Sequence, residues 1–279
     1  MTKLKIAVTG KGGVGKTTVV AGLARSFAKA GNRVIALDVD PSPNLLSALG
    51  SVTDVRTVKP LMEMRNLIEE RTGIPSQGYS LVFKLNPKVD DILEKFGIKC
   101  KDGVELLVVG EIKQGGEGCF CPANALARRL VDHLAEAGDI LIMDMEAGVE
   151  HLGRGTTRGM EILLIVVEPS LRSVETAGRI KKLSDDFAVE KVLAVINKVK
   201  SEEEEKVISN RLRYLGIPVV YTIPYDTAIA KADMEGVSIF DIKEGEQMFE
   251  RMKELSKILE TKKSSPFKKE YEHFNSFKT

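Results

Sequence analysis

A glycine-rich segment near the N-terminus has the residue types and spacing that bind a phosphate chain. Its residues are Gly10, Lys11, Gly12, Gly13, Val14, Gly15, Lys16 and Thr17, which fit the pattern G-x-x-x-x-G-K-[ST]. Glycines let consecutive backbone N–H groups turn toward one phosphate, and the following helix adds the positive end of its dipole. We expect Lys16 to bind the β- and γ-phosphates, Thr17 to bind Mg²⁺ through its hydroxyl, and Thr18 to donate to the α-phosphate.

A second chemical motif is the cysteine pair Cys119 and Cys121, which lies in a glycine-rich stretch directly before Pro122. Thiols beside a helix N-terminus ionise readily and bind soft metals. One C-x-C supplies only two ligands, whereas tetrahedral zinc or an iron–sulfur cluster usually takes four. Two copies that meet at a two-fold axis would supply four sulfurs, so the pair predicts a metal site shared between subunits. The alternative is a pair of incidental loop thiols.

The elements around these motifs alternate between short apolar runs and longer amphipathic stretches. The expected strands are residues 5–9, 33–38, 105–109, 140–144, 162–167, 191–197 and 219–223. The expected helices are residues 15–30, 59–71, 122–137, 171–187, 202–215 and 246–260. Nearly continuous apolar runs are typical of strands covered on both faces. The alternation predicts an α/β fold with a doubly wound, mostly parallel sheet flanked by helices.

Capping and helix-terminating residues mark several helix ends. Ser201 followed by Glu204 fits a capping box, and Gly216 fits a helix end. The stretch 51–103 breaks the alternation, so we expect one P-loop domain over residues 1–262 with an insertion at about 51–103. Residues 263–279 are expected to form a polar C-terminal tail.

Composition excludes several classes of protein. With 41 Lys and Arg against 40 Asp and Glu, the net charge is +1, which argues against nucleic acid as the main partner. The apolar run 162–167 is far shorter than the roughly 20 residues of a membrane span. No secretory signal opens the chain, and three cysteines do not form a disulfide scaffold. We therefore expect a cytoplasmic protein that does not bind membranes.

Residues 11–17, with a lysine early in the loop, resemble the deviant Walker A loop of a family of dimeric ATPases. That family includes the nitrogenase iron protein, the division-site regulator MinD and the chromosome-partition ATPases. The resemblance implies a homodimer in which Lys11 reaches the partner's nucleotide and stabilises charge on the transferring phosphoryl group. It also implies that residues 38–41 form switch I and that residues 144–148 run from Walker B into switch II.

The same resemblance assigns roles to polar residues that follow the expected strands. Asp38 and Asp144 would lie near Mg²⁺, and Asp40 would orient the attacking water. Asn197 resembles the asparagine that these ATPases use to recognise the adenine edge, and Pro224 resembles their base-flanking loop, although an asparagine at a strand end is also a good turn residue.

Switch II carries two further expectations. The N–H of Gly148 would sense the γ-phosphate. Glu146 departs from the small residue or proline of the family, and its extra negative charge near the γ-phosphate would alter hydrolysis or the movement of the switch.

The C-x-C motif and its flanks narrow the resemblance further. Together with residues 85–89, 110–116 and 150–156 they resemble the CooC-type nickel-insertion ATPases of carbon monoxide dehydrogenase maturation. This implies an ATP-dependent metallochaperone that hydrolyses ATP to ADP with Mg²⁺. It would bind Zn²⁺ or Ni²⁺ between two subunits through Cys119 and Cys121, with carbon monoxide dehydrogenase as its client. Two alternatives stay open: an ATPase like the nitrogenase iron protein with an intersubunit iron–sulfur cluster, and a MinD-like positioning ATPase.

Overall fold

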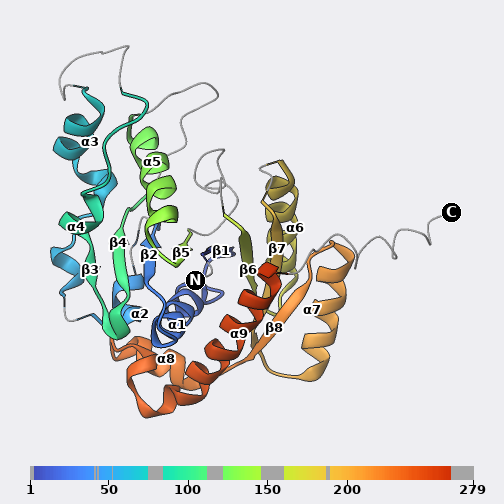
Figure 1. Ribbon diagram of the computed structural model, residues 1–279. Helices are drawn as coiled ribbons and strands as arrows, with labels where there is room; N and C mark the ends of the chain where they lie inside the picture. Colours follow the sequence, from blue (N-terminus) through green and yellow to red (C-terminus); the bar gives the residue numbers. More distant parts are fainter. Residues whose placement is uncertain are drawn as a thin grey trace.

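An eight-stranded sheet forms the centre of the described part of the chain (Figure 1). The computed structural model describes residues 3–40, 42, 44–51, 53–74, 84–111, 122–145, 160–186 and 189–264. The strands are β1 (Leu4–Gly10), β2 (Val34–Asp38), β3 (Ile98–Lys99), β4 (Glu105–Val108), β5 (Ile140–Asp144), β6 (Ile162–Val167), β7 (Lys191–Val199) and β8 (Val219–Pro224). Their order is β3-β4-β2-β5-β1-β6-β7-β8, and every neighbouring pair is parallel except β3 and β4. This confirms the predicted doubly wound sheet.

Helices cover both faces of this sheet (Figure 1). They are α1 (Lys16–Lys29), α2 (Leu45–Leu49), α3 (Arg65–Thr72), α4 (Ile92–Phe96), α5 (Pro122–Ala137), α6 (Leu171–Asp186), α7 (Glu202–Tyr214), α8 (Thr227–Met234) and α9 (Glu246–Ser264). Apolar residues of α1, α2 and α9 pack on one face, and those of α3, α4, α5, α6 and α7 pack on the other. None of the helices in the described ranges is both long enough and apolar enough to cross a bilayer.

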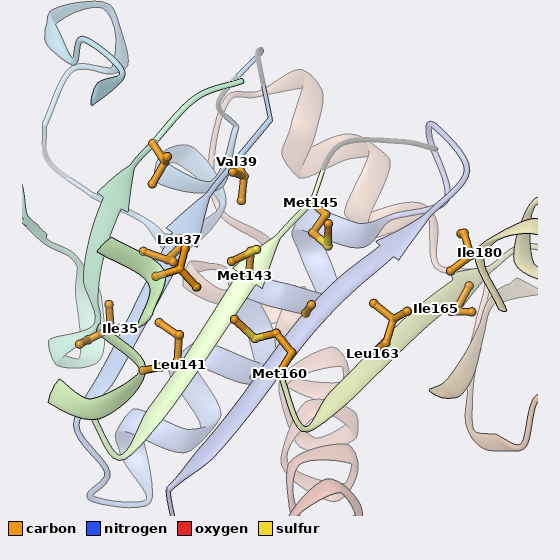
Figure 2. Packing of buried hydrophobic residues seen from close by; sticks show 14 of the residues in the cluster. Ile35, Leu37, Val39, Leu141, Met143, Met145, Met160, Leu163, Ile165 and Ile180 are labelled. Carbon is orange, nitrogen blue, oxygen red and sulfur yellow. The ribbon is translucent and has the colours of Figure 1, made fainter. Parts of the chain in front are cut away.

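Most strand residues are apolar because the sheet packs against a hydrophobic core on each face, and the buried polar residues Asp38, Asp144 and Asn197 lie toward the carboxyl ends of their strands. Along β2, Ile35 and Leu37 point into the core under α5, which Figure 2 shows, whereas Val34 and Ala36 point into the core under α1. Side chains on a strand alternate between faces, so a strand covered on both sides is mostly apolar at every position. Full burial of one such aliphatic side chain is worth about 1.5–3 kcal/mol.

The seven predicted strands are all present, and the differences lie at short or interrupted elements. The predicted helix at 59–71 begins only at Arg65, because Met64 has a non-helical backbone with ψ of 79°. A 3-10 turn at Leu61–Glu63 precedes it. Strand β3 has two residues, α2 and α4 have five each and α8 has eight, and none of these four was predicted. A two-residue strand leaves no periodic pattern to detect.

The predicted helix caps of α7 are largely confirmed. The Ser201 hydroxyl accepts a hydrogen bond from the Glu204 N–H at 3.2 Å. The Glu204 carboxylate accepts instead from the N–H of Lys200 at 2.8 Å, one residue earlier than in a complete capping box. Gly216 ends the helix with a φ of +70°, a left-handed conformation that glycine adopts without steric penalty.

Candidate functional site

The glycine-rich loop joins β1 to α1 at the centre of the sheet (Figure 1). Three of its glycines have positive φ: Gly10 at +149°, Gly13 at +78° and Gly15 at +96°. A Cβ on Gly10 would collide with the carbonyl oxygen of Val166. The loop therefore needs glycine both for its backbone conformation and for its close contact with β6.

The residues after the loop begin α1. Lys16 is the first residue of this 14-residue helix, and it is 8% exposed. Its Nζ lies 3.5 Å from the Lys11 carbonyl oxygen. Thr17 and Thr18 follow in the first turn and are half-buried. The backbone N–H groups of a first helical turn have no partners within the helix, so this end of α1 favours a bound phosphate.

Two buried carboxylates stand beside the loop at the carboxyl edge of the sheet. Asp38 ends β2 and Asp144 ends β5, and these residues pair directly across the two strands. Asp38 accepts hydrogen bonds from the N–H groups of Leu45 at 3.0 Å and Asp40 at 3.2 Å. Asp144 is 2% exposed, and its Oδ1 has no hydrogen-bond partner among the described residues. The sheet thus brings together acids that are 106 residues apart in the sequence.

Burial gives both acids unusual electrostatics. Loss of solvation raises the pKa of Asp144 to about 7, and repulsion from Asp38 adds to the rise. A hydrogen bond with Thr17 and the charge of Lys16 act in the opposite direction on the pKa of Asp144. Loss of solvation likewise raises the pKa of Asp38 to about 6, against the hydrogen bonds from Leu45 and Asp40. A cation bound nearby would offset both the lost solvation and the mutual repulsion of these two carboxylates, so the pair favours cation binding.

These observations fit a Mg²⁺ site. The unpartnered Asp144 oxygen, the neighbouring Asp38 and the Thr17 hydroxyl supply hard oxygen donors. In the described ranges no group of three or more His, Cys, Asp or Glu residues could hold a metal ion by itself. Magnesium bound with a nucleotide usually takes one or two protein oxygens and completes its shell with phosphates and water, so a larger cage is not required.

Asp40 lies at the same edge, two residues after Asp38. It is half-buried, and its Oδ1 accepts a hydrogen bond from the N–H of Ser42 at 2.8 Å. The chain turns back here, which leaves Asp40 beside the carboxylate pair. Its role toward water stays a prediction.

Asn197 braces the phosphate loop. Its side chain is buried, and Nδ2 donates to the Val14 carbonyl at 2.8 Å while Oδ1 accepts from the Lys198 N–H at 2.9 Å. Lys198 has a left-handed backbone with φ of +63°, and its Nζ donates to the Gly13 carbonyl at 2.6 Å. The bonding atoms of the Asn197 side chain are thus engaged with the protein, and base recognition by Asn197 stays a prediction.

Pro224 ends β8 on the neighbouring strand. It is exposed and pairs with Val199, two residues after Asn197 on β7. The adjacent Tyr225 lies under the Lys200 ammonium, with 4.9 Å between Nζ and the ring centroid. Pro224 and Asn197 therefore stand on adjacent strands at one edge of the sheet, as a base-flanking pair would require.

Two site residues carry no assignment from the sequence: Lys198 and Glu168. Glu168 follows β6 directly and accepts a hydrogen bond from Lys11 Nζ at 2.9 Å. The sequence did contain a signal for Glu168, namely its position directly after a strand. Asp38, Asp144 and Glu168 all stand at the carboxyl ends of strands. Several expected residues lie outside the described ranges, namely Cys119, Cys121, Glu146 and Gly148.

Comparison with known proteins identifies the family. Residues 5–239 match the model of the CobQ/CobB/MinD/ParA nucleotide binding domain, named CbiA. The chain belongs to this family. An ATP-binding protein of Methanocaldococcus jannaschii, itself uncharacterized, is 44% identical over 85% of this chain and 91% of its own length. The carbon monoxide dehydrogenase accessory protein CooC of Rhodospirillum rubrum is 42% identical over 86% of this chain and 90% of its own length.

Solved structures of the family have the same fold. The MinD cell division protein of Aquifex aeolicus superposes with a TM-score of 0.67 at 21% identity, covering 92% of this chain and 96% of that one. MinD of Pyrococcus horikoshii, solved with Mg-ADP, gives 0.64 at 20% identity, covering 95% and 100%. The family match and the 42% identity to CooC confirm the deviant Walker A resemblance, and the protein is a P-loop ATPase by family.

Proposed function

We propose that this protein is an ATP-dependent metallochaperone that assists nickel insertion into carbon monoxide dehydrogenase. One observation carries the proposal: the 42% identity to the accessory protein CooC, which extends over 86% of this chain. The ATPase part of such a protein is supported by two features: the phosphate loop, which Asn197 holds through a hydrogen bond to Val14, and the buried carboxylate pair beside it.

In the proposed reaction Lys16 binds the β- and γ-phosphates, and the first turn of α1 donates its N–H groups to them. Thr17, Asp38 and Asp144 would hold Mg²⁺, which supplies charge neutralisation on the phosphate oxygens when bound. Asp40 orients the attacking water.

Two further contacts complete the proposed site. Asn197 and Pro224 flank the adenine base of ATP or ADP. Lys11 acts on the nucleotide of the partner subunit, so hydrolysis requires a homodimer.

The proposed metal site consists of Cys119 and Cys121 from each of two subunits. Four thiolates around a two-fold axis suit Zn²⁺ or Ni²⁺, which is the cargo and not a resident cofactor. Cys100 is a poor alternative ligand because burial raises the pKa of its thiol to about 11. Exchange between ATP and ADP would alter metal affinity, and by linkage the metal would alter nucleotide affinity equally.

Metal content and mass in solution test this proposal together. We expect the protein with a nonhydrolysable ATP analogue to sediment as a dimer that holds about one metal ion per two chains. The double variant Cys119→Ala with Cys121→Ala should lose the metal and keep ATP binding. Cys100→Ala is the matched control and should keep both.

Each other outcome identifies a different function. A brown, reducible chromophore in anaerobically purified protein would favour the iron–sulfur alternative. Co-sedimentation with liposomes in the presence of ATP would favour a MinD-like positioning ATPase. A Lys16→Ala variant should lose ATP binding or turnover, and unchanged ATP hydrolysis would contradict the phosphate-loop assignment itself.

A further inference from the structure

The two lysines of the phosphate loop have different surroundings. Lys16 is buried at the start of α1. Lys11 is 36% exposed, and its ammonium group forms an ion pair with Glu168 at 2.9 Å. Glu168 stands at the end of β6, the strand next to β1 (Figure 1). Lys11 is therefore held against its own chain.

The turn between β6 and α6 fixes the position of Glu168. The Glu168 N–H donates to the Ser173 hydroxyl at 3.1 Å, and the Glu168 carbonyl accepts from the Ser170 N–H at 2.7 Å. The Ser173 N–H in turn donates to the Ser170 hydroxyl at 3.2 Å, and Ser173 is 1% exposed. These bonds anchor the backbone that carries the carboxylate, whereas Lys11 has a long flexible side chain. Release of this ion pair is thus a movement of Lys11.

We infer that Glu168 is a positioning residue that retains Lys11 on its own chain until a triphosphate competes for the ammonium group. This rests on the proposed function, in which Lys11 acts on the nucleotide of the partner subunit. A phosphate chain is a stronger competitor than a single carboxylate because it carries more negative charge on more acceptor oxygens. A part-exposed ion pair changes an equilibrium constant by about two- to five-fold. A dimer breaks two such pairs, so Glu168 opposes association by about 4- to 25-fold.

The retention of Lys11 is measured without nucleotide. The wild type and Glu168→Gln are treated with an amine-reactive ester, and the acylation rate of each lysine is followed by peptide mass spectrometry. We expect the Lys11 rate to rise about two- to five-fold in Glu168→Gln relative to the other lysines, because the released amine becomes accessible. Equal Lys11 rates in the two proteins would overturn the inference. A general loosening of the structure would raise many rates and would also count against it.

Glu161→Gln is the matched control. Glu161 directly precedes β6, at the end of the strand away from Glu168, and forms an ion pair with Lys263 at 2.9 Å. The side chains of Glu161 and Lys263 are 24% and 21% exposed. Those values are close to the 23% exposure of Glu168 and the 36% exposure of Lys11. Glu161→Gln therefore removes a comparable ion pair away from the loop, and it should leave the Lys11 rate unchanged.

Sedimentation with a nonhydrolysable ATP analogue measures the consequence. We expect the dimer dissociation constant of Glu168→Gln to fall about 4- to 25-fold, with no change for Glu161→Gln. An unchanged or higher dissociation constant for Glu168→Gln would overturn the inference, because Glu168 would then be neutral or useful in the dimer. A wild type that stays a single chain with the analogue would contradict the proposed function. The acylation rates would still decide whether Glu168 holds Lys11.

Discussion

Replacement of Asp144 by Asn should stabilise the nucleotide-free protein at pH 8. Asp144 is buried, its Oδ1 has no hydrogen-bond partner within the part of the chain that the structure describes, and burial with repulsion from Asp38 raises its pKa to about 7. The folded protein therefore holds the Asp144 proton more tightly than the unfolded chain, whose aspartates have the usual pKa of 3.8. The contribution of Asp144 to stability is therefore greatest below pH 3.8, falls as the pH rises from 3.8 to about 7, and changes little above 7, because over that window only the folded protein still holds the proton.

The size of the effect follows from the two pKa values. The difference between 3.8 and about 7 corresponds to roughly 4 kcal/mol of lost stability at pH 8. The new amide also meets an incomplete hydrogen-bond environment, which costs about 1–2 kcal/mol and leaves a gain of roughly 2–3 kcal/mol. For a chain of 279 residues this gain raises the melting temperature by about 4 °C. At pH 5 the gain should shrink to less than half, since Asp144 is then protonated in the folded state.

Thermal unfolding followed by circular dichroism from pH 5 to pH 8, without nucleotide or Mg²⁺, measures this difference. Asp139→Asn is the matched control, because Asp139 directly precedes the same strand and accepts a hydrogen bond from the Arg33 N–H at 3.0 Å. Its effect should not vary over this pH range. An Asp144→Asn variant that melts below the wild type at pH 8, or that differs from it equally at pH 5 and pH 8, would refute the electrostatic account. The variant should also lose the Mg²⁺-dependent part of the stabilisation by ATP.

Two further substitutions test the loop and its supporting helix. Asn197→Ala should cost about 1–3 kcal/mol of stability and weaken ATP binding, because the Val14 carbonyl and the Lys198 N–H lose their partner. If calorimetric titration of this variant with ATP gave the wild-type affinity, Asn197 would not contribute to the nucleotide site. Gly22→Val should lower the free energy of unfolding by about 1–3 kcal/mol in urea, because a Cβ at Gly22 already collides with the Met252 side chain of α9 and lies 2.7 Å from the Phe240 ring. An unchanged urea midpoint would mean that the contact between α1 and α9 adapts without strain.

The order of the chain's elements was readable from the sequence because its signals are local. Each strand is a short run of β-branched and aliphatic residues, and the spacing of glycines and lysine in residues 10–16 defines the loop without reference to the rest of the chain. Strand β3 escaped prediction because two residues carry no period. Helix α3 was predicted too long because the 3-10 turn at Leu61–Glu63 and the non-helical Met64 interrupt the apolar pattern that the prediction treated as one helix.

The tertiary structure decided what the loop and the acids touch. Asp38 and Asp144 become neighbours only because β5 inserts between β2 and β1, and burial there gives them their raised pKa values. The sequence marked Asn197 as a polar residue at a strand end, whereas the fold bonds it to Val14, 183 positions away. Lys11 and Glu168 are likewise 157 positions apart. Backbone conformation and apolar burial are encoded within a few residues, but ion pairs and desolvation depend on which strands become neighbours.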